Sequence, residues 1–217
     1  MDAEESRARR PRPRIESFSD LIFGLALSVG AFSLVSSPPA TADALYADIA
    51  TFGFNFLVLI SVWMKYTRIM SVLPLENRRT TLLNSLLLFA VSMEPFLFNI
   101  LRSGNTQTPA AAELLNAATA LYGVDIGAML CMMGVFTVTL ADEERKLVPE
   151  DMLHELRLEA VLSFVGGGIF LVSALPVFGY AFLAGNSARI DLWLAAVVIF
   201  WARRTAVRLG RIRKTEG

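Results

Sequence analysis

The chain has 217 residues, of which 54% are hydrophobic and 18% are charged, and its mean hydropathy is +0.52. The charged fraction lies below the roughly 25% of a soluble domain, and the apolar residues come in blocks about as long as a bilayer crossing. These features exclude an ordinary soluble protein and predict an all-α polytopic integral membrane protein. The formal net charge is zero, and the single cysteine, Cys131, excludes a disulfide framework within one chain.

Six apolar blocks predict six transmembrane helices, which form a single domain over residues 1–217. The blocks run over Phe18–Val35, Ile49–Met64, Thr81–Leu101, Leu114–Leu140, Ala160–Ala184 and Ser187–Ala202. The last two are so close together that they predict a helical hairpin. The charged fourth connection predicts a short amphipathic cytoplasmic helix with Leu147, Leu153, Leu156 and Leu158 on its apolar side, which Pro149 either starts or breaks.

Basic residues gather at alternate connections between the predicted helices. Of the 20 Lys and Arg residues, all but Arg102 and Arg189 lie in the amino-terminal tail, the second and fourth connections, and the carboxyl-terminal tail. The positive-inside rule then places both termini in the cytoplasm, so that residues 1–14 and 203–217 form basic cytoplasmic tails of a multi-pass protein of the cell membrane. Nucleic-acid binding is the other use of such clusters, but no aromatic residues interleave the basic ones.

The first block carries a carboxylate and several small polar residues. On a helix, Asp20, Gly24 and Ser28 fall along one stripe. The adjoining apolar ridge consists of Leu21, Leu25, Val29 and Phe32. A charged residue within a span costs at least ~2.5 kcal/mol and normally faces protein or water. Two interpretations stay open on these grounds: a face on which neighbouring helices pack closely, or a helix whose apolar ridge narrows a water-filled pore.

The start of the first block resembles a known family. The stretch "RIESFSD" resembles the R-x-x-x-F-S-D signature that opens the first span of transmembrane protein 175-type potassium channels. The matching residues are Arg14, Phe18, Ser19 and Asp20. Three further features look like the prokaryotic members of that family: Trp63 late in the second block, "PF" at Pro95 and Phe96, and Tyr122 early in the fourth block.

The resemblance implies a potassium-selective, leak-like channel: a homotetramer in the lipid bilayer with the first helix of each subunit around a central pore. It implies a permeant potassium ion, no cofactor, no catalytic residue and no metal site. These channels lack a T-V-G-Y-G filter, and so does this chain. Their hydrophobic constriction maps onto Leu25, Val29 and Phe32, and their pore hydroxyl onto Ser28. Arg14, Asp20 and Trp63 would hold the pore helix in place.

The chain departs from the family at several of these positions. Leu25 stands where Ile is frequent, and Phe32 is bulkier than the usual Leu. After Trp63 the family usually carries a pair of His residues, whereas this chain has Tyr66 and Thr67. Hydrogen bonding between that pair and the signature must therefore be rebuilt, and Lys65 or Arg68 near Asp20 are the candidates for this.

The remaining acids of the predicted spans have two interpretations each. We expect Glu94 to be satisfied locally beside Pro95 or to lie near the outer interface, the alternative being a role in attracting cations. Asp125 is expected to pair across helices, or to accept a hydrogen bond from Asn84 or Asn116. The stretch "VGGGIF" over residues 165–170 is read as a close-packing or flexible patch.

Two other classes of function are possible for a membrane protein of this kind. A secondary transporter of a small ion or solute is the main alternative, although six spans without a visible repeat argue against it. An enzyme is not expected, because the only histidine, His154, lies in a charged connection and leaves no Ser–His pair or multi-histidine metal site within the membrane. Asp20 and Asp125 lack the Gly-rich motif expected of an aspartyl dyad.

Overall fold

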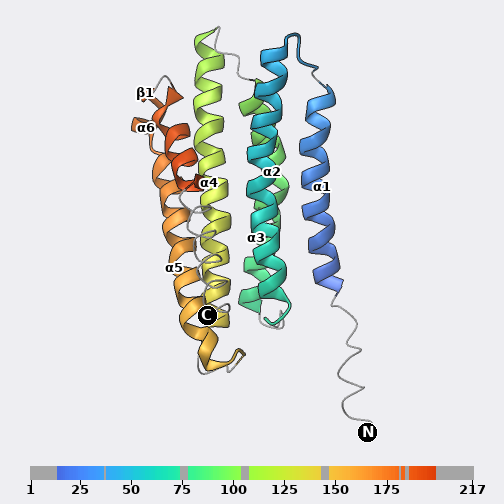
Figure 1. Cartoon of the computed structure of the whole chain (residues 1–217), viewed down its shortest axis with the longest axis vertical. Coiled ribbons are helices and arrows are strands. Elements are labelled where there is room, and N and C mark those ends of the chain that lie inside the picture. Colours follow the sequence, from blue (N-terminus) through green and yellow to red (C-terminus); the bar gives the residue numbers. More distant parts are fainter. Residues whose placement is uncertain are drawn as a thin grey trace, which may run out of the picture.

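The computed structural model describes residues 14–36, 38–73, 78–103, 108–142, 147–180, 182–183 and 186–198. Long helices dominate this part of the chain (Figure 1). They are α1 (Arg14–Ser36), α2 (Ala42–Met70), α3 (Arg78–Ser103), α4 (Pro109–Leu140) and α5 (Glu150–Ser173). Within the described ranges, these 5 helices are long and apolar enough to cross a membrane. The prediction of an all-α polytopic membrane protein is confirmed.

Two helices begin earlier than their apolar blocks because capping residues set their first turns. Thr41 is the N-cap of α2, and its side chain accepts a hydrogen bond from the amide of Ala44 at 3.2 Å. Thr108 caps α4 in the same way through Ala111, also at 3.2 Å, and Pro109 occupies the first turn, where its missing N–H costs nothing. Hydropathy locates the membrane-spanning part of a helix, and capping locates its end.

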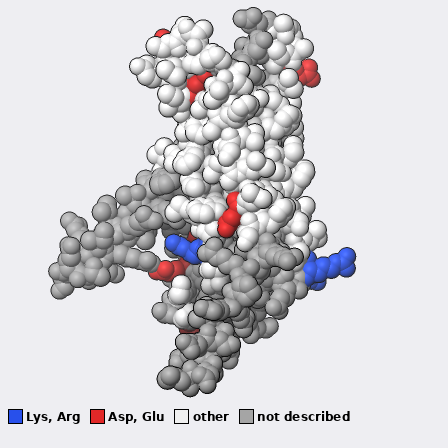
Figure 2. All heavy atoms as spheres, turned by 90° about the vertical axis from the view of Figure 1, so that its right-hand side faces the viewer, with Lys and Arg blue, Asp and Glu red and all other residues white. Residues whose placement is uncertain are grey.

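The long helices run up and down in sequence order, so alternate connections lie at the same end of the bundle (Figure 1). α4 packs against both α3 and α5, while α1 lies at the opposite edge and contacts α2 and α3. Figure 2 views the molecule from the α1 side. The Lys and Arg residues visible on this face lie in its lower part, and the upper part is uncharged apart from a few carboxylates.

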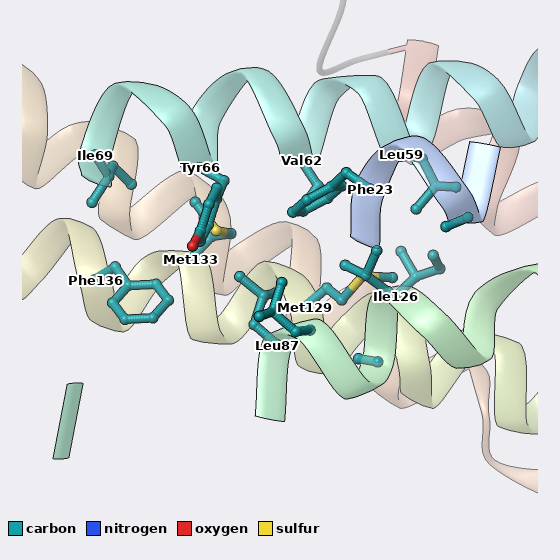
Figure 3. Close-up of a cluster of buried hydrophobic side chains, with 14 of the residues drawn as sticks. Phe23, Leu59, Val62, Tyr66, Ile69, Leu87, Ile126, Met129, Met133 and Phe136 are labelled. Carbon is teal, nitrogen blue, oxygen red and sulfur yellow. The ribbon is translucent and has the colours of Figure 1, made fainter. Parts of the chain in front are cut away.

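The core is formed mainly by the inward faces of α1 to α4. Figure 3 shows side chains from these helices meeting in one apolar cluster. Its labelled members are Phe23 of α1, Leu59, Val62, Tyr66 and Ile69 of α2, Leu87 of α3, and Ile126, Met129, Met133 and Phe136 of α4. Each of these side chains is buried, and the many van der Waals contacts that they make favour the packing of the helices.

The predicted end of the fifth helix is wrong. α5 ends at Ser173 rather than continuing to Ala184, and a separate short helix, α6 (Pro176–Tyr180), follows. Pro176 explains the break, because a proline ring clashes with the carbonyl four residues before it and supplies no N–H. A two-residue antiparallel pair, β1 (Phe182–Leu183) with β2 (Asn186–Ser187), then turns the chain. The connection is thus longer than a simple helical hairpin requires.

A further helix covers residues 188–198 and corresponds to the start of the predicted sixth span. The rest of that span and the predicted basic tails over 1–14 and 203–217 lie outside the described residues, apart from the backbone of Arg14.

The amphipathic helix expected in the fourth connection is not a separate element. Pro149 is the N-cap of α5, so residues 150–159 form the first turns of that helix. Leu156 is buried, and Leu147 and Leu153 pack against the core, but Leu158 is exposed. The apolar side that faces the bundle therefore includes Leu147, Leu153 and Leu156 but not Leu158.

Candidate functional site: the two faces of α1

One face of α1 is packed tightly against its own subunit. Ser19, Phe23, Ala26 and Gly30 are buried along it. The ring of Phe23 lies 5.5 Å from that of Tyr66, centroid to centroid. A Cβ at Gly30 would lie 3.4 Å from the Asn55 amide nitrogen and 3.7 Å from the ring of Phe52, so α1 and α2 approach each other closely at this position. This face fixes the orientation of the whole helix.

The opposite face of α1 is exposed in the single subunit. It carries the predicted constriction residues, with Leu25, Val29 and Phe32 at 61%, 49% and 68% exposure. The hydroxyl of Ser28 is also exposed and bonds to the carbonyl of Gly24 in its own helix, at 2.8 Å. No described side chain comes within 4 Å of a Cβ built at Gly24. A large apolar face of this kind meets lipid or another protein chain.

Asp20 is held by the tryptophan that the family resemblance singled out. The indole Nε1 of Trp63 donates a hydrogen bond to Asp20 Oδ1 at 3.1 Å. This bond ties the first turns of α1 to the last turns of α2. It gives a carboxylate within the candidate first span a polar partner, which lowers the cost of keeping it there. Phe18, of the same signature, is 57% exposed, and the side chain of Arg14 lies outside the described residues.

The neighbouring signature residue, Ser19, takes part in a buried hydrogen-bonded group. The hydroxyl of Tyr66 is bonded to Ser19 Oγ at 2.7 Å and to Asn84 Oδ1 at 2.9 Å. All three side chains are buried, and they come from α1, α2 and α3 respectively. Tyr66 stands where the family usually has a histidine, so a phenol hydroxyl joins the signature to two other helices in this chain.

The prediction that Lys65 approaches Asp20 is wrong. Lys65 points to α5 instead, where its ammonium lies 3.6 Å from Glu159 Oε1 and is hydrogen-bonded to Ser163 Oγ. The other candidate, Arg68, is exposed. The reason is helical geometry: residues 63 and 66 share the face of α2 that meets α1, and residue 65 lies on another face.

Two acids lie inside the bundle without hydrogen bonds of normal geometry to the described residues. Glu94 is 0% exposed, and neither of its carboxylate oxygens has a hydrogen bond of normal geometry, but the polar side chains of Asn55 and Tyr122 lie beside it. Asn55 of α2 and Tyr122 of α4 are thus the neighbours that can satisfy Glu94. Asp125 Oδ2 is likewise buried and unpaired.

The amides proposed as partners of Asp125 are engaged elsewhere. Asn84 bonds to Tyr66, and Asn116 accepts from Arg189. The expected hydrogen bond from either amide to Asp125 is not present among the described contacts, which leaves Asp125 Oδ2 without the partner that the sequence suggested.

Arg189 is a structural residue that the sequence analysis missed. It is 1% exposed, and its guanidinium donates to the carbonyl of Ser173 at 2.8 Å, the carbonyl and side-chain oxygens of Asn116 at 3.0 Å, and Thr119 Oγ1 at 2.5 Å. Longer contacts reach the carbonyls of Ala174 and Leu175. Ser173 and Ala174 lie where Pro176 stops α5 from continuing, so Arg189 supplies donors to carbonyls at the end of that helix. The sequence offered one signal of this role: Arg189 is one of only two basic residues outside the tails and the two basic connections.

The glycine-rich stretch of α5 packs closely on α4. A Cβ at Gly167 would lie 2.6 Å from Cys131 Sγ and 2.8 Å from the carbonyl of Gly127. Conversely, a Cβ at Gly127 would lie 2.9 Å from the carbonyl of Gly167. The two backbones thus meet at a pair of glycines, as small residues allow in membrane helices, and the close-packing interpretation of "VGGGIF" is confirmed.

Comparison with known proteins covers the first part of the chain. The family model described as "Endosomal/lysosomal potassium channel TMEM175" matches residues 14–95, less than half of the chain. A protein named "Potassium channel" from Marivirga tractuosa is 32% identical over 85 residues, which are 38% of this chain and 34% of that protein. The match therefore spans about a third of the relative's length. No solved structure matches. These findings support the resemblance predicted from the sequence: residues 14–95 are similar to the transmembrane protein 175 family.

Proposed function

We propose that the chain is a subunit of a potassium channel of the cell membrane, with both termini in the cytoplasm and with α1 lining a central pore in a homotetramer. The observation that carries the proposal is the contrast between the two faces of α1. Phe23 and Ala26 are 1% and 4% exposed, whereas Leu25 and Phe32, on the other side, are 61% and 68% exposed. Within the single subunit, only one face of α1 packs against other helices.

Three features favour a pore over a lipid-facing surface for the exposed half. It combines an apolar ridge with Ser28, Gly24 and Ser17, which a helix facing only lipid does not need. The same turns belong to the segment that matches the potassium channel family. Finally, Asp20 and Ser19 fasten the helix through bonds to Trp63 and Tyr66, so the exposed ridge has a defined direction.

The proposed selectivity rests on hydration. A ring of Leu25, Val29 and Phe32 side chains offers no carbonyl oxygens to replace the water around an ion. Potassium gives up part of its hydration shell more readily than sodium does, so a narrow apolar ring passes partly hydrated K⁺ in preference to Na⁺. The resulting preference is modest and needs no rigid filter. The polar residues around Asp20 hold the helix and do not bind the ion.

The direct test is a recording of K⁺ and Na⁺ currents from the purified protein in planar bilayers, with Leu25→Ala as the variant. Leu82 of α3 is the matched control, because it is also 61% exposed and lies outside α1. We expect Leu25→Ala to raise the conductance and lower the preference for K⁺, and Leu82→Ala to change neither.

Unchanged currents in Leu25→Ala would show that the constriction is assigned wrongly. A saturable flux coupled to a counter-ion, in place of a channel current, would instead identify a secondary transporter. Chemical cross-linking of the detergent-purified protein gives the number of subunits, for which four are expected.

A further inference from the structure

A cavity of about 110 Å³ lies between α2, α4, α5 and the helix over residues 188–198, away from the exposed face of α1. Its lining is mainly apolar and includes Leu57, Val58, Leu130, Leu162 and Val197. The cavity is partly open to the outside of the bundle. An apolar cavity of roughly 150 Å³ is enough to hold benzene and stays dry without it. In a membrane, the material available to fill such a space is an acyl chain.

One end of the cavity is polar. Lys65 of α2 and both Glu159 and Ser163 of α5 line it there. The ammonium of Lys65 lies 3.6 Å from Glu159 Oε1 and is hydrogen-bonded to Ser163 Oγ. The side chain of Glu159 is 34% exposed. The Ser163 hydroxyl donates to the carbonyl of Glu159 at 2.8 Å. A cation and an accessible anion thus stand side by side at the mouth of an apolar space.

The sequence places this polar end at the boundary of the bilayer. On α5, several charged residues lie in 150–159 and none in 160–173. On α2, no charged residue lies between Asp48 and Lys65. Both helices therefore pass from hydrocarbon to the headgroup region at Lys65 and Glu159. These positions lie toward the end of the bundle where α2 finishes and α5 begins (Figure 1).

We propose that this cavity is a binding site for a zwitterionic phospholipid of the phosphatidylethanolamine type. One acyl chain fills the apolar space between α2 and α5, the phosphate accepts a hydrogen bond from the Lys65 ammonium, and the lipid ammonium meets the carboxylate of Glu159. We choose this headgroup because Lys65 and Glu159 place a positive and a negative charge side by side at the mouth of the cavity. Phosphatidylglycerol, whose only charge is its phosphate, could pair with Lys65 but would place a neutral glycerol against Glu159 and leave that carboxylate without a cation from the lipid. The site is separate from the proposed pore and does not depend on it.

A larger side chain at Gly166 would fill part of the cavity. Gly166 lines the space, and a Cβ there would meet only Leu130 Cδ1, at 3.6 Å. A leucine at this position would extend into the cavity. Gly168 is the matched control on the same helix, because a Cβ there has nothing within 4 Å and the residue does not line the cavity. Glu159→Gln tests the headgroup, since it removes only the charge that would meet the ammonium.

The experiment is native mass spectrometry of the purified full chain, titrated with phosphatidylethanolamine or with phosphatidylglycerol of the same acyl chains. For the unchanged protein we expect a bound phosphatidylethanolamine that survives detergent removal, and weaker retention of phosphatidylglycerol. Gly166→Leu should reduce phosphatidylethanolamine binding by about tenfold, and Gly168→Leu should leave it unchanged. Glu159→Gln should shift the preference toward phosphatidylglycerol.

A second measurement needs no variant. Phosphatidylethanolamine with a photoactivatable acyl chain should cross-link to the segments over residues 57–65 and 159–166 of the unchanged protein. Equal retention of the two lipids, equal binding by Gly166→Leu and Gly168→Leu, or cross-links scattered over the outer surface would each overturn the proposal. If Gly166→Leu fails to fold, as judged by circular dichroism and gel filtration, the cross-linking result decides.

Discussion

Trp63 and Asp20 lie 43 positions apart in sequence and are joined by a hydrogen bond of 3.1 Å from the indole nitrogen to the carboxylate. The bond links the turn of α1 that carries the signature to the far end of α2. Because the ridge of Leu25 and Val29 starts just beyond Asp20 on the same rigid helix, the direction of that ridge depends on this contact.

Replacing Trp63 by Phe removes the donor and keeps an aromatic ring. We expect the free energy of unfolding to fall by about 1–3 kcal/mol, because the Asp20 carboxylate loses its indole partner, and the K⁺ conductance to change because α1 is less firmly held. Thermal unfolding and bilayer recordings measure the two effects. Trp193→Phe is the control: it removes an indole bond to Ser173 Oγ, at 2.7 Å, far from α1, and should lower stability without altering the current.

Tyr66→Phe tests the buried group formed with Ser19 and Asn84. The change deletes one hydroxyl, leaves two buried polar side chains without their shared partner, and should cost about 1–3 kcal/mol. Tyr46→Phe makes the same chemical change at a residue that is 69% exposed, and should be close to neutral. Equal unfolding temperatures for the two variants would show that the Tyr66 hydroxyl contributes nothing to holding α1.

Glu94→Gln keeps the size of a buried side chain and removes its capacity for charge. An ionised carboxylate without partners in an interior is costly, so we expect the Gln variant to unfold at the same temperature as the parent or higher. Glu113→Gln, at an exposed position of α4, serves as the control. A large loss of stability in Glu94→Gln would mean that the carboxylate is stabilised by its neighbours Asn55 and Tyr122.

Gly167→Ala should disturb the contact of α4 with α5. The added methyl would lie 2.6 Å from Cys131 Sγ and 2.8 Å from the carbonyl of Gly127, and overpacking of this kind typically costs about 1–3 kcal/mol. Gly168→Ala adds the same methyl where nothing lies within 4 Å. Unfolding in a mild detergent should separate the two variants; matching curves would show that the helices adjust without cost.

The sequence was sufficient to locate the membrane-spanning parts of the long helices, because each apolar block is about as long as the bilayer is thick, but it did not predict that α5 ends at Ser173. The family resemblance also predicted that Trp63 helps to hold the first helix in place, and Trp63 is bonded to Asp20 of that helix. The sequence did not predict the role of Lys65, since which face of α2 meets α5 depends on how the whole bundle packs. The burial of Arg189 escaped prediction for a similar reason: several of its partners are backbone carbonyls, at Ser173, Ala174 and Asn116, and backbone carbonyls at the end of a helix leave no mark in the composition of the chain.

The buried guanidinium also bears on how the protein is made. The ribosome releases the end of α5 before it releases Arg189, so for a short interval the carbonyls of Ser173 and Ala174 lack their arginine partner. Unsatisfied carbonyls are costly in hydrocarbon. The end of α5 should therefore stay in the water-filled insertion machinery until the next helix arrives, and the two should leave it for the lipid as one unit.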